Sequence, residues 1–142
     1  MAKVNRLRSV LQAMKRPLVV SVLKIDKDCY VNQDWIRDWK CLVVLPVCRS
    51  FGLQVTSIRM TESKKGLHFY IGINPPVHAE LANRIHWLIG DDCRRVDFNR
   101  ARIHAGYVGW NKLFEPENTR VVELYSNRAE ALHVMRKAAV VN

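Results

Sequence analysis

Two aspartates separated by one residue are the first side chains in the sequence whose types and spacing could do chemistry. They follow residues 18–25, a nearly all-apolar run rich in β-branched residues, which predicts a strand buried on both faces. An i, i+2 spacing on a strand places Asp26 and Asp28 on one face, with their Cα atoms about 6–7 Å apart. Such a pair suits hard divalent cations, which take oxygen ligands. Acidic pairs at strand ends also serve as turn or capping residues, so the pair alone leaves both interpretations open.

A second group of candidate residues lies in a basic turn that leads into a strand. Residues 61–70 read Thr-Glu-Ser-Lys-Lys-Gly-Leu-His-Phe-Tyr. Ser63, Lys64, Lys65 and the backbone N–H groups around Gly66 could form a cradle for an anion, and His68 could donate a hydrogen bond to a phosphate oxygen. An ordinary exposed hairpin followed by a half-buried structural histidine explains the same pattern.

A third group, residues 90–98, contains three further carboxylates. Asp91 and Asp92 could form the polar turn after a helix. Asp97 stands between Val96 and Phe98 on what the pattern predicts to be a short strand, and a buried aspartate is costly unless it is paired or binds a metal. A salt bridge to a neighbouring arginine would also explain it.

Together these groups resemble the motif set of the archaeo-eukaryotic primase superfamily. Residues 23–28 (Leu-Lys-Ile-Asp-Lys-Asp) correspond to its first motif, and Val96 with Asp97 to its third. Residues 63–68 (Ser-Lys-Lys-Gly-Leu-His) correspond to the second and are close to the Ser-Lys-Gly-Leu-His stretch of the polymerase domain in bacterial end-joining ligases. The resemblance spans residues 19–98.

The resemblance implies a nucleotidyl transfer site on a template or primer. Asp26, Asp28 and Asp97 would hold two Mg²⁺ or Mn²⁺ ions, with Asp92 as the alternative to Asp97. His68, with Ser63 and Lys65, would bind the phosphates of a nucleoside triphosphate. The family's usual second module is missing from so short a chain, so a partner subunit could complete the cleft.

The helices and strands that we expect around these residues indicate a single α+β domain. Residues 1–16 form a basic amphipathic helix, residues 18–98 the motif-bearing core, and residues 99–142 a C-terminal extension. In the core we expect a helix over 33–51 that Pro46 kinks or ends, strands over 53–60 and 67–73, and a helix opened by Pro75 and Pro76 and ended by Gly90. This β-α-β-β-α order matches an RNA-recognition-like (RRM-like) sheet. A strand over 121–125 and a helix over 129–139 would follow.

Composition indicates a polyanionic partner. The 142 residues carry 23 Lys+Arg against 13 Asp+Glu, a net charge of +10, and 49% of them are hydrophobic, which describes one folded domain and excludes a disordered basic tail. Nucleic acid is the commonest partner of so basic a domain. The residues predicted to contact DNA, or alternatively RNA, are Arg59, Arg94, Arg95, Arg100, Arg102, Tyr107, Trp110 and Lys112.

The lack of a recognisable targeting signal and the spacing of the cysteines indicate a cytoplasmic protein. The basic start of the chain has no uninterrupted apolar run before Pro17, and no stretch reaches the roughly 18 apolar residues of a membrane span. The four cysteines have irregular spacings, which favours reduced thiols over disulfides or a zinc site. A viral or plasmid origin fits so small a chain.

The sequence therefore predicts a minimal primase-polymerase-type nucleotidyltransferase. Two alternatives stay open. One is a non-catalytic nucleic-acid-binding protein of the same architecture, and the other is a small basic subunit of a nucleoprotein assembly.

Overall fold

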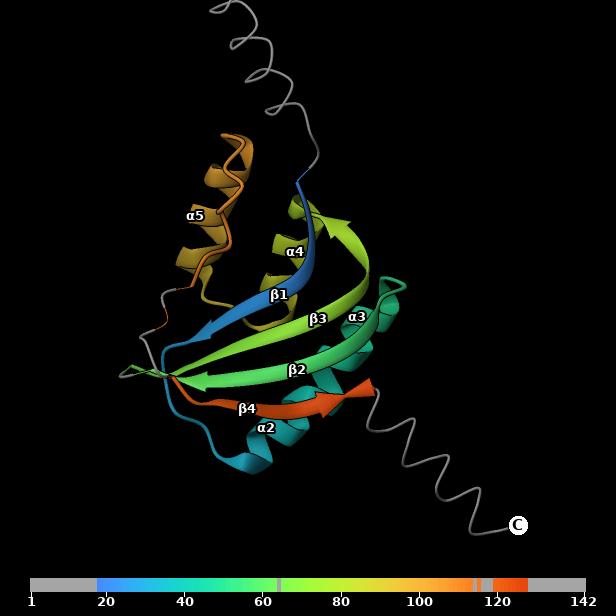
Figure 1. Ribbon diagram of the computed structural model, residues 1–142, viewed down its shortest axis with the longest axis vertical. Coiled ribbons are helices and arrows are strands. Elements are labelled where there is room, and N and C mark those ends of the chain that lie inside the picture. Colours follow the sequence, from blue (N-terminus) through green and yellow to red (C-terminus); the bar gives the residue numbers. More distant parts are fainter. Residues whose placement is uncertain (1–17, 64, 114, 116–118, 128–142) are drawn as a thin grey trace, which may run out of the picture.

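The chain folds around one antiparallel sheet with helices packed against it, which confirms the predicted α+β class (Figure 1). The computed structural model describes residues 18–63, 65–113, 115 and 119–127. Its strands are β1 (Val19–Lys27), β2 (Gln54–Glu62), β3 (Leu67–His78) and β4 (Val121–Ser126), in the order β1-β3-β2-β4. The helices are α2 (Gln33–Trp39), a π-helical turn η1 (Lys40–Val44), α3 (Leu45–Ser50), α4 (Ala79–Ile89) and α5 (Cys93–His104). The helices predicted over 1–16 and 129–139 lie outside the described residues.

β1 lies at the edge of the sheet. The prediction that both of its faces are buried is wrong. Leu23 and Ile25 are fully buried and pair with Ile71 and Phe69 of β3, whereas Val19 and Val22 are exposed. The difference arises because an antiparallel sheet can cover one face with helices and keep polar side chains on the other. Asp26 and His68 pair across the strands on that second face.

The helical segment between β1 and β2 continues past Pro46. Pro46 lies in the first turn of α3, and the wider π turn η1 comes directly before it. Proline has no N–H group and crowds the preceding turn, so a local widening lets the helical path continue where we expected a kink or an end. Trp39 anchors this segment because its Nε1 donates a hydrogen bond of 2.8 Å to the Ile89 carbonyl at the end of α4.

The chain between β3 and β4 differs most from the prediction. Pro75 and Pro76 belong to the end of β3, and α4 begins only at Ala79, with His78 as its N-cap. The predicted strand over 96–98 is wrong, because these residues lie inside α5. The N-cap Asp92 accepts hydrogen bonds from the amides of Arg94 and Arg95, and few apolar residues mark the buried side of this helix.

The turn between β2 and β3 packs tightly against the end of β1. A Cβ atom on Gly66 would lie 1.9 Å from the Lys27 carbonyl oxygen and 2.8 Å from the Cys29 amide nitrogen. Both neighbours are backbone atoms, so a larger residue would force the turn away from β1. The close approach fixes Ser63 and Lys65 beside Asp26 and Asp28.

None of the helices in the described part of the chain is long and apolar enough to cross a membrane. The four cysteines are free thiols, of which Cys48 is buried.

We predict that Gly66→Ala destabilises the protein, whereas Gly109→Ala does not. The first change places a methyl group against backbone atoms, and the second meets no atom within 4 Å. We expect Gly66→Ala to lower the free energy of unfolding by at least about 2 kcal/mol in urea denaturation. Equal stability of the two variants would show that the turn does not rest on β1.

Candidate active site

A cleft of about 780 Å³ lies where the ends of β1 and the β2–β3 turn meet α5. Most of the residues predicted from the three sequence motifs line it. The lining side chains are those of Asp26, Asp28, Ser63, Lys65, His68, Asp92, Arg95, Phe98, Arg102, Lys112 and Leu113.

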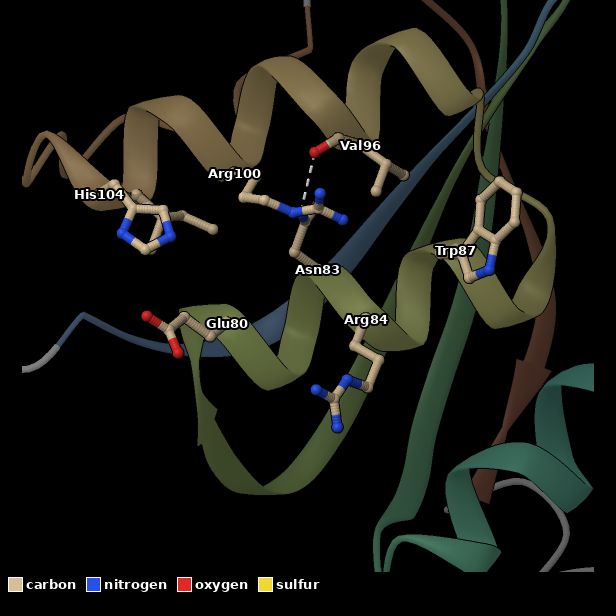
Figure 2. A pocket seen from close by; sticks show the side chains of 8 residues that line it. Glu80, Asn83, Arg84, Trp87, Val96, Arg100 and His104 are labelled. Atoms are coloured by element: carbon tan, nitrogen blue, oxygen red, sulfur yellow. Dashed lines mark hydrogen bonds between the residues drawn. The ribbon is translucent and has the colours of Figure 1, made fainter.

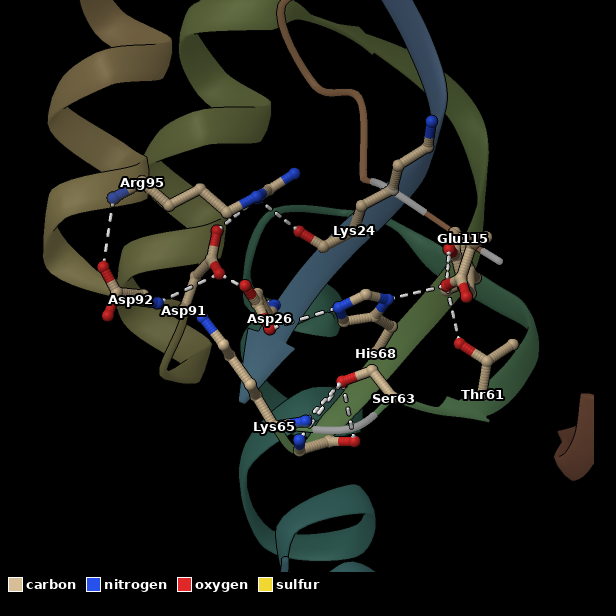
Figure 3. Close-up of polar contacts among 12 residues, drawn as sticks. Lys24, Asp26, Thr61, Ser63, Lys65, His68, Asp91, Asp92, Arg95 and Glu115 are labelled. Atoms are coloured by element: carbon tan, nitrogen blue, oxygen red, sulfur yellow. Dashed lines mark hydrogen bonds and ion pairs between the residues drawn. The ribbon is translucent and has the colours of Figure 1, made fainter. Parts of the chain in front are cut away.

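Side chains from α4, the turn after it and α5 complete the hydrogen bonding of the outer edge of β1; Figure 3 shows Asp91 and Arg95 in this role. The Lys24 amide donates to His86 Nε2 at 3.2 Å, and the Asp26 amide donates to Asp91 Oδ1 at 3.0 Å. Arg95 Nη1 donates to the Lys24 carbonyl at 2.8 Å. These bonds take the place of a neighbouring strand and fix the backbone at Asp26.

Two of the groups that hold this edge, Asp91 and Arg95, are paired with each other. The Asp91 carboxylate is fully buried and lies 2.5 Å from Arg95 Nη1. Arg95 Nη2 donates to Asn111 Oδ1 at 2.6 Å and to the Asn111 carbonyl at 3.2 Å. Burial raises the pKa of Asp91 in spite of the opposing Arg95 charge. Arg95 therefore positions β1, and its guanidinium is already engaged by four acceptors.

On the other side of Asp26, His68 lies between two carboxylates. Its Nε2 is 3.4 Å from Asp26 Oδ1, and its Nδ1 is 2.7 Å from Glu115 Oε1 (Figure 3). The same Glu115 oxygen accepts hydrogen bonds from Thr61 Oγ1 at 2.6 Å and from the Tyr70 hydroxyl. Burial acts to raise the pKa of Glu115, but the hydrogen bonds outweigh it and lower the pKa. Glu115 thus holds the ring of His68 with Nε2 toward the cleft.

Negative charge gathers around Asp26. Burial is the main reason that the pKa of Asp26 is raised; the nearby Asp28 and Asp92 carboxylates raise it further, while His68 and Arg95 act in the opposite direction. A cation bound here would relieve the repulsion among the three carboxylates.

Positive charge without a carboxylate partner faces the same cleft. Lys65, Arg102 and Lys112 line it, and none of them forms an ion pair with another described residue. Three unpaired cations beside three carboxylates could bind an anion that carries its own metal ion.

No group of three or more His, Cys, Asp or Glu side chains within residues 18–63, 65–113, 115 and 119–127 is arranged to hold a metal ion by itself. The oxygen donors of Asp26, Asp28 and Asp92 nevertheless suit Mg²⁺ in kind. Mg²⁺ is usually bound through one or two carboxylates together with substrate phosphates, so a complete protein cage is not required.

The structure does not bring Asp97 to the cleft. Its side chain is 75% exposed on α5, 3.8 Å from Arg100 Nη1. The predicted third carboxylate is therefore out of place, because helix α5 turns Asp97 outward, whereas Asp92, at the helix N-terminus, lines the cleft together with Asp26.

Several residues predicted to bind nucleic acid also lie elsewhere. Trp110 is buried and packs on His86 with ring centroids 5.8 Å apart, so it cannot stack on a base. Tyr107 and Arg94 are exposed but do not line the cleft, and Arg59 faces Glu123 across β2 and β4.

Arg100 lines a separate cavity of about 320 Å³ between α4 and α5 (Figure 2). Arg84 and Trp87 line the same cavity. Trp87 is 57% exposed.

Sequence reasoning missed the supporting residues Glu115 and His86 and the supporting role of Asp91. No local signal could identify Glu115, because it contacts His68 across 47 positions of sequence. His86 likewise contacts the Lys24 amide across 62 positions of sequence.

The comparisons with known proteins gave no relative: no family model, no curated protein and no solved structure matches the chain.

We predict that His86→Gln removes part of the loss of stability on acidification. Burial, with the charges of Arg95 and Lys24, lowers the pKa of His86 from 6.5 to about 3. The unfolded chain thus binds more protons between these values, so stability falls as pH decreases below about 6.5, by at most about 1.4 kcal/mol per pH unit. The Gln side chain can still accept a hydrogen bond from the Lys24 amide. Urea denaturation between pH 6.5 and 5 should show a shallower slope in the variant, and identical slopes would contradict the account.

We also predict that Glu115→Gln releases His68. The change removes the charged carboxylate that accepts hydrogen bonds from His68, Thr61 and Tyr70, so the free energy of unfolding should fall by about 1–3 kcal/mol. The imidazole Nδ1–H proton of His68 should lose its protection from exchange in NMR spectra. Glu62→Gln, at an exposed position at the end of β2, is the matched control. A protected Nδ1–H in Glu115→Gln would refute this role.

Proposed function

We propose that the protein is a minimal primase-polymerase-type nucleotidyltransferase that binds a metal-bound nucleoside triphosphate in the cleft. The observation that carries the proposal is the gathering of Asp26, Asp28 and Asp92 opposite Lys65, Arg102 and Lys112 in one cleft. A metal-bound triphosphate presents cations to the carboxylates and phosphate oxygens to the basic side chains. Few other ligands match both sets at once.

The residues take distinct roles in this proposal. Asp26 and Asp28, with Asp92 in place of Asp97, would hold Mg²⁺ or Mn²⁺, which stabilises charge during attack by a 3′-hydroxyl. Lys65 and His68 Nε2 would contact the phosphates. Ser63 shapes the turn, since its Oγ accepts hydrogen bonds from the amides of Lys65 and Gly66.

The fold supports the proposal in part. β3 lies between β1 and β2, and helices join β1 to β2 and follow β3, as in an RRM-like core. β4 pairs with β2, whereas an RNA-recognition fold places its last strand beside the first. The resemblance to the primase superfamily therefore rests on the β1-to-α4 part of the chain.

A non-catalytic nucleic-acid-binding protein is the second candidate. It is favoured by Asp92, whose carboxylate caps α5, and by Asp26, which already contacts His68. In this case the aspartates are structural, and the basic side of α5 binds the phosphate backbone.

We predict that primer extension with labelled nucleotides and Mn²⁺ separates these functions. Asp26→Asn and Asp92→Asn should each reduce product at least about 100-fold, because each removes a charge that stabilises the reacting phosphates. Asn remains a good N-cap, so Asp92→Asn preserves the start of α5. Asp97→Asn is the matched control and should extend the primer as the wild type does.

Two results would contradict this account. One is loss of product in Asp97→Asn with full product in Asp92→Asn, which would keep the enzyme but overturn the assignment of Asp92 as the third carboxylate. The other is no product from the wild type although it binds single-stranded DNA in a salt-dependent way, which would establish the second candidate.

A further inference from the structure

Phe98 is an exposed aromatic residue within the cleft that neither the motifs nor the proposed roles explain. Its side chain is 62% exposed, and it lies on α5 among basic residues. Single exposed apolar residues are common on protein surfaces, so exposure alone carries no weight. Its place in a cleft that Arg102 and Leu113 also line is what calls for an explanation.

Phe98 lies further along α5 than the carboxylate end of the cleft, which Asp92 marks. Six positions separate the two residues, which corresponds to about 9 Å along the helix axis. Phe98 and Leu113 are the apolar side chains among the residues that line the cleft, and the other lining side chains are charged or polar. A ligand that fills the cleft therefore meets an apolar surface at Phe98 as well as the charged groups.

We propose that Phe98 is the stacking platform for the base of the bound nucleoside triphosphate. This inference rests on the proposed function, because it assumes that the phosphates occupy the carboxylate end. A base is joined to its phosphates through one sugar, which suits the separation between Asp92 and Phe98. Stacking uses the π face that every base has, so Phe98 contributes affinity and does not select among bases.

Isothermal titration with two ligands tests the inference: ATP and inorganic tripolyphosphate, each with Mg²⁺. Phe98→Ala should weaken ATP binding about tenfold and leave tripolyphosphate binding unchanged, since only ATP has a base. Phe98→Tyr should bind ATP as the wild type does. Trp87→Ala, at an exposed aromatic residue on the separate α4–α5 cavity, is the control and should change neither affinity. Because Phe98 is exposed, thermal unfolding should be the same for all variants.

Each other outcome overturns the inference in a recognisable way. If the wild type binds both ligands equally and Phe98→Ala changes neither, the base does not stack on Phe98, although the proposed function stands. Equal weakening of both ligands by Phe98→Ala would assign Phe98 a structural role. If Phe98→Ala weakens only a single-stranded oligonucleotide, the platform serves a base of the strand. If the wild type binds neither ligand, the proposed function itself fails.

Discussion

The backbone groups on the outer edge of β1 must be hydrogen-bonded, and the candidate site depends on which side chains bond to them. An edge strand leaves every second amide and carbonyl without a neighbouring strand, and buried backbone groups are costly when unpaired. Here His86, Asp91 and Arg95 supply the missing partners. Because these side chains come from α4, the turn after it and α5, the same bonds place the start of α5 beside the end of β1. Asp92 thereby comes to line the same cleft as Asp26.

The other side of the cleft is fixed by an equally specific contact. Gly66 brings the β2–β3 turn against the backbone of Lys27, so Lys65 lies next to the carboxylates. Glu115 then holds His68 from the sheet face by accepting hydrogen bonds from three side chains. Carboxylates and cations are therefore close together without neutralising one another in ion pairs. Such an arrangement leaves both kinds of charge available to a ligand that carries both, and this is the basis for proposing a metal-bound nucleotide.

The sequence predicted the parts of the site that depend on local spacing. These parts lie within two strands and one turn and comprise Asp26, Asp28, Ser63, Lys65 and His68. The alternation of apolar and polar residues in the strands and the glycine of the turn can be recognised in the sequence. Asp97 was misplaced because its apolar neighbours Val96 and Phe98 suggest a strand, whereas the Asp92 cap starts a helix there.

Tertiary contacts decided what could not be predicted. Trp110 lies in a glycine-rich stretch typical of a loop, yet it is buried against His86, 24 positions earlier in the sequence. The partners of Arg95 lie at Lys24 and Asn111, so its structural role is set by packing and not by the basic pattern of α5. Residues that support a site from a distance are chosen by the fold, and a sequence pattern does not reveal them.

The central claim is that Asp26, Asp28 and Asp92 hold a divalent cation beside a nucleotide. Mn²⁺ titration followed by NMR tests it most directly, because the paramagnetic ion broadens the signals of nearby amides. With ATP present, the account predicts broadening centred on the amides of Asp26, Asp28, Lys65 and Asp92 at the lowest Mn²⁺ concentrations, with the Asp97 amide less affected. Broadening centred on Asp97, or spread evenly over the acidic residues of the surface, would contradict it.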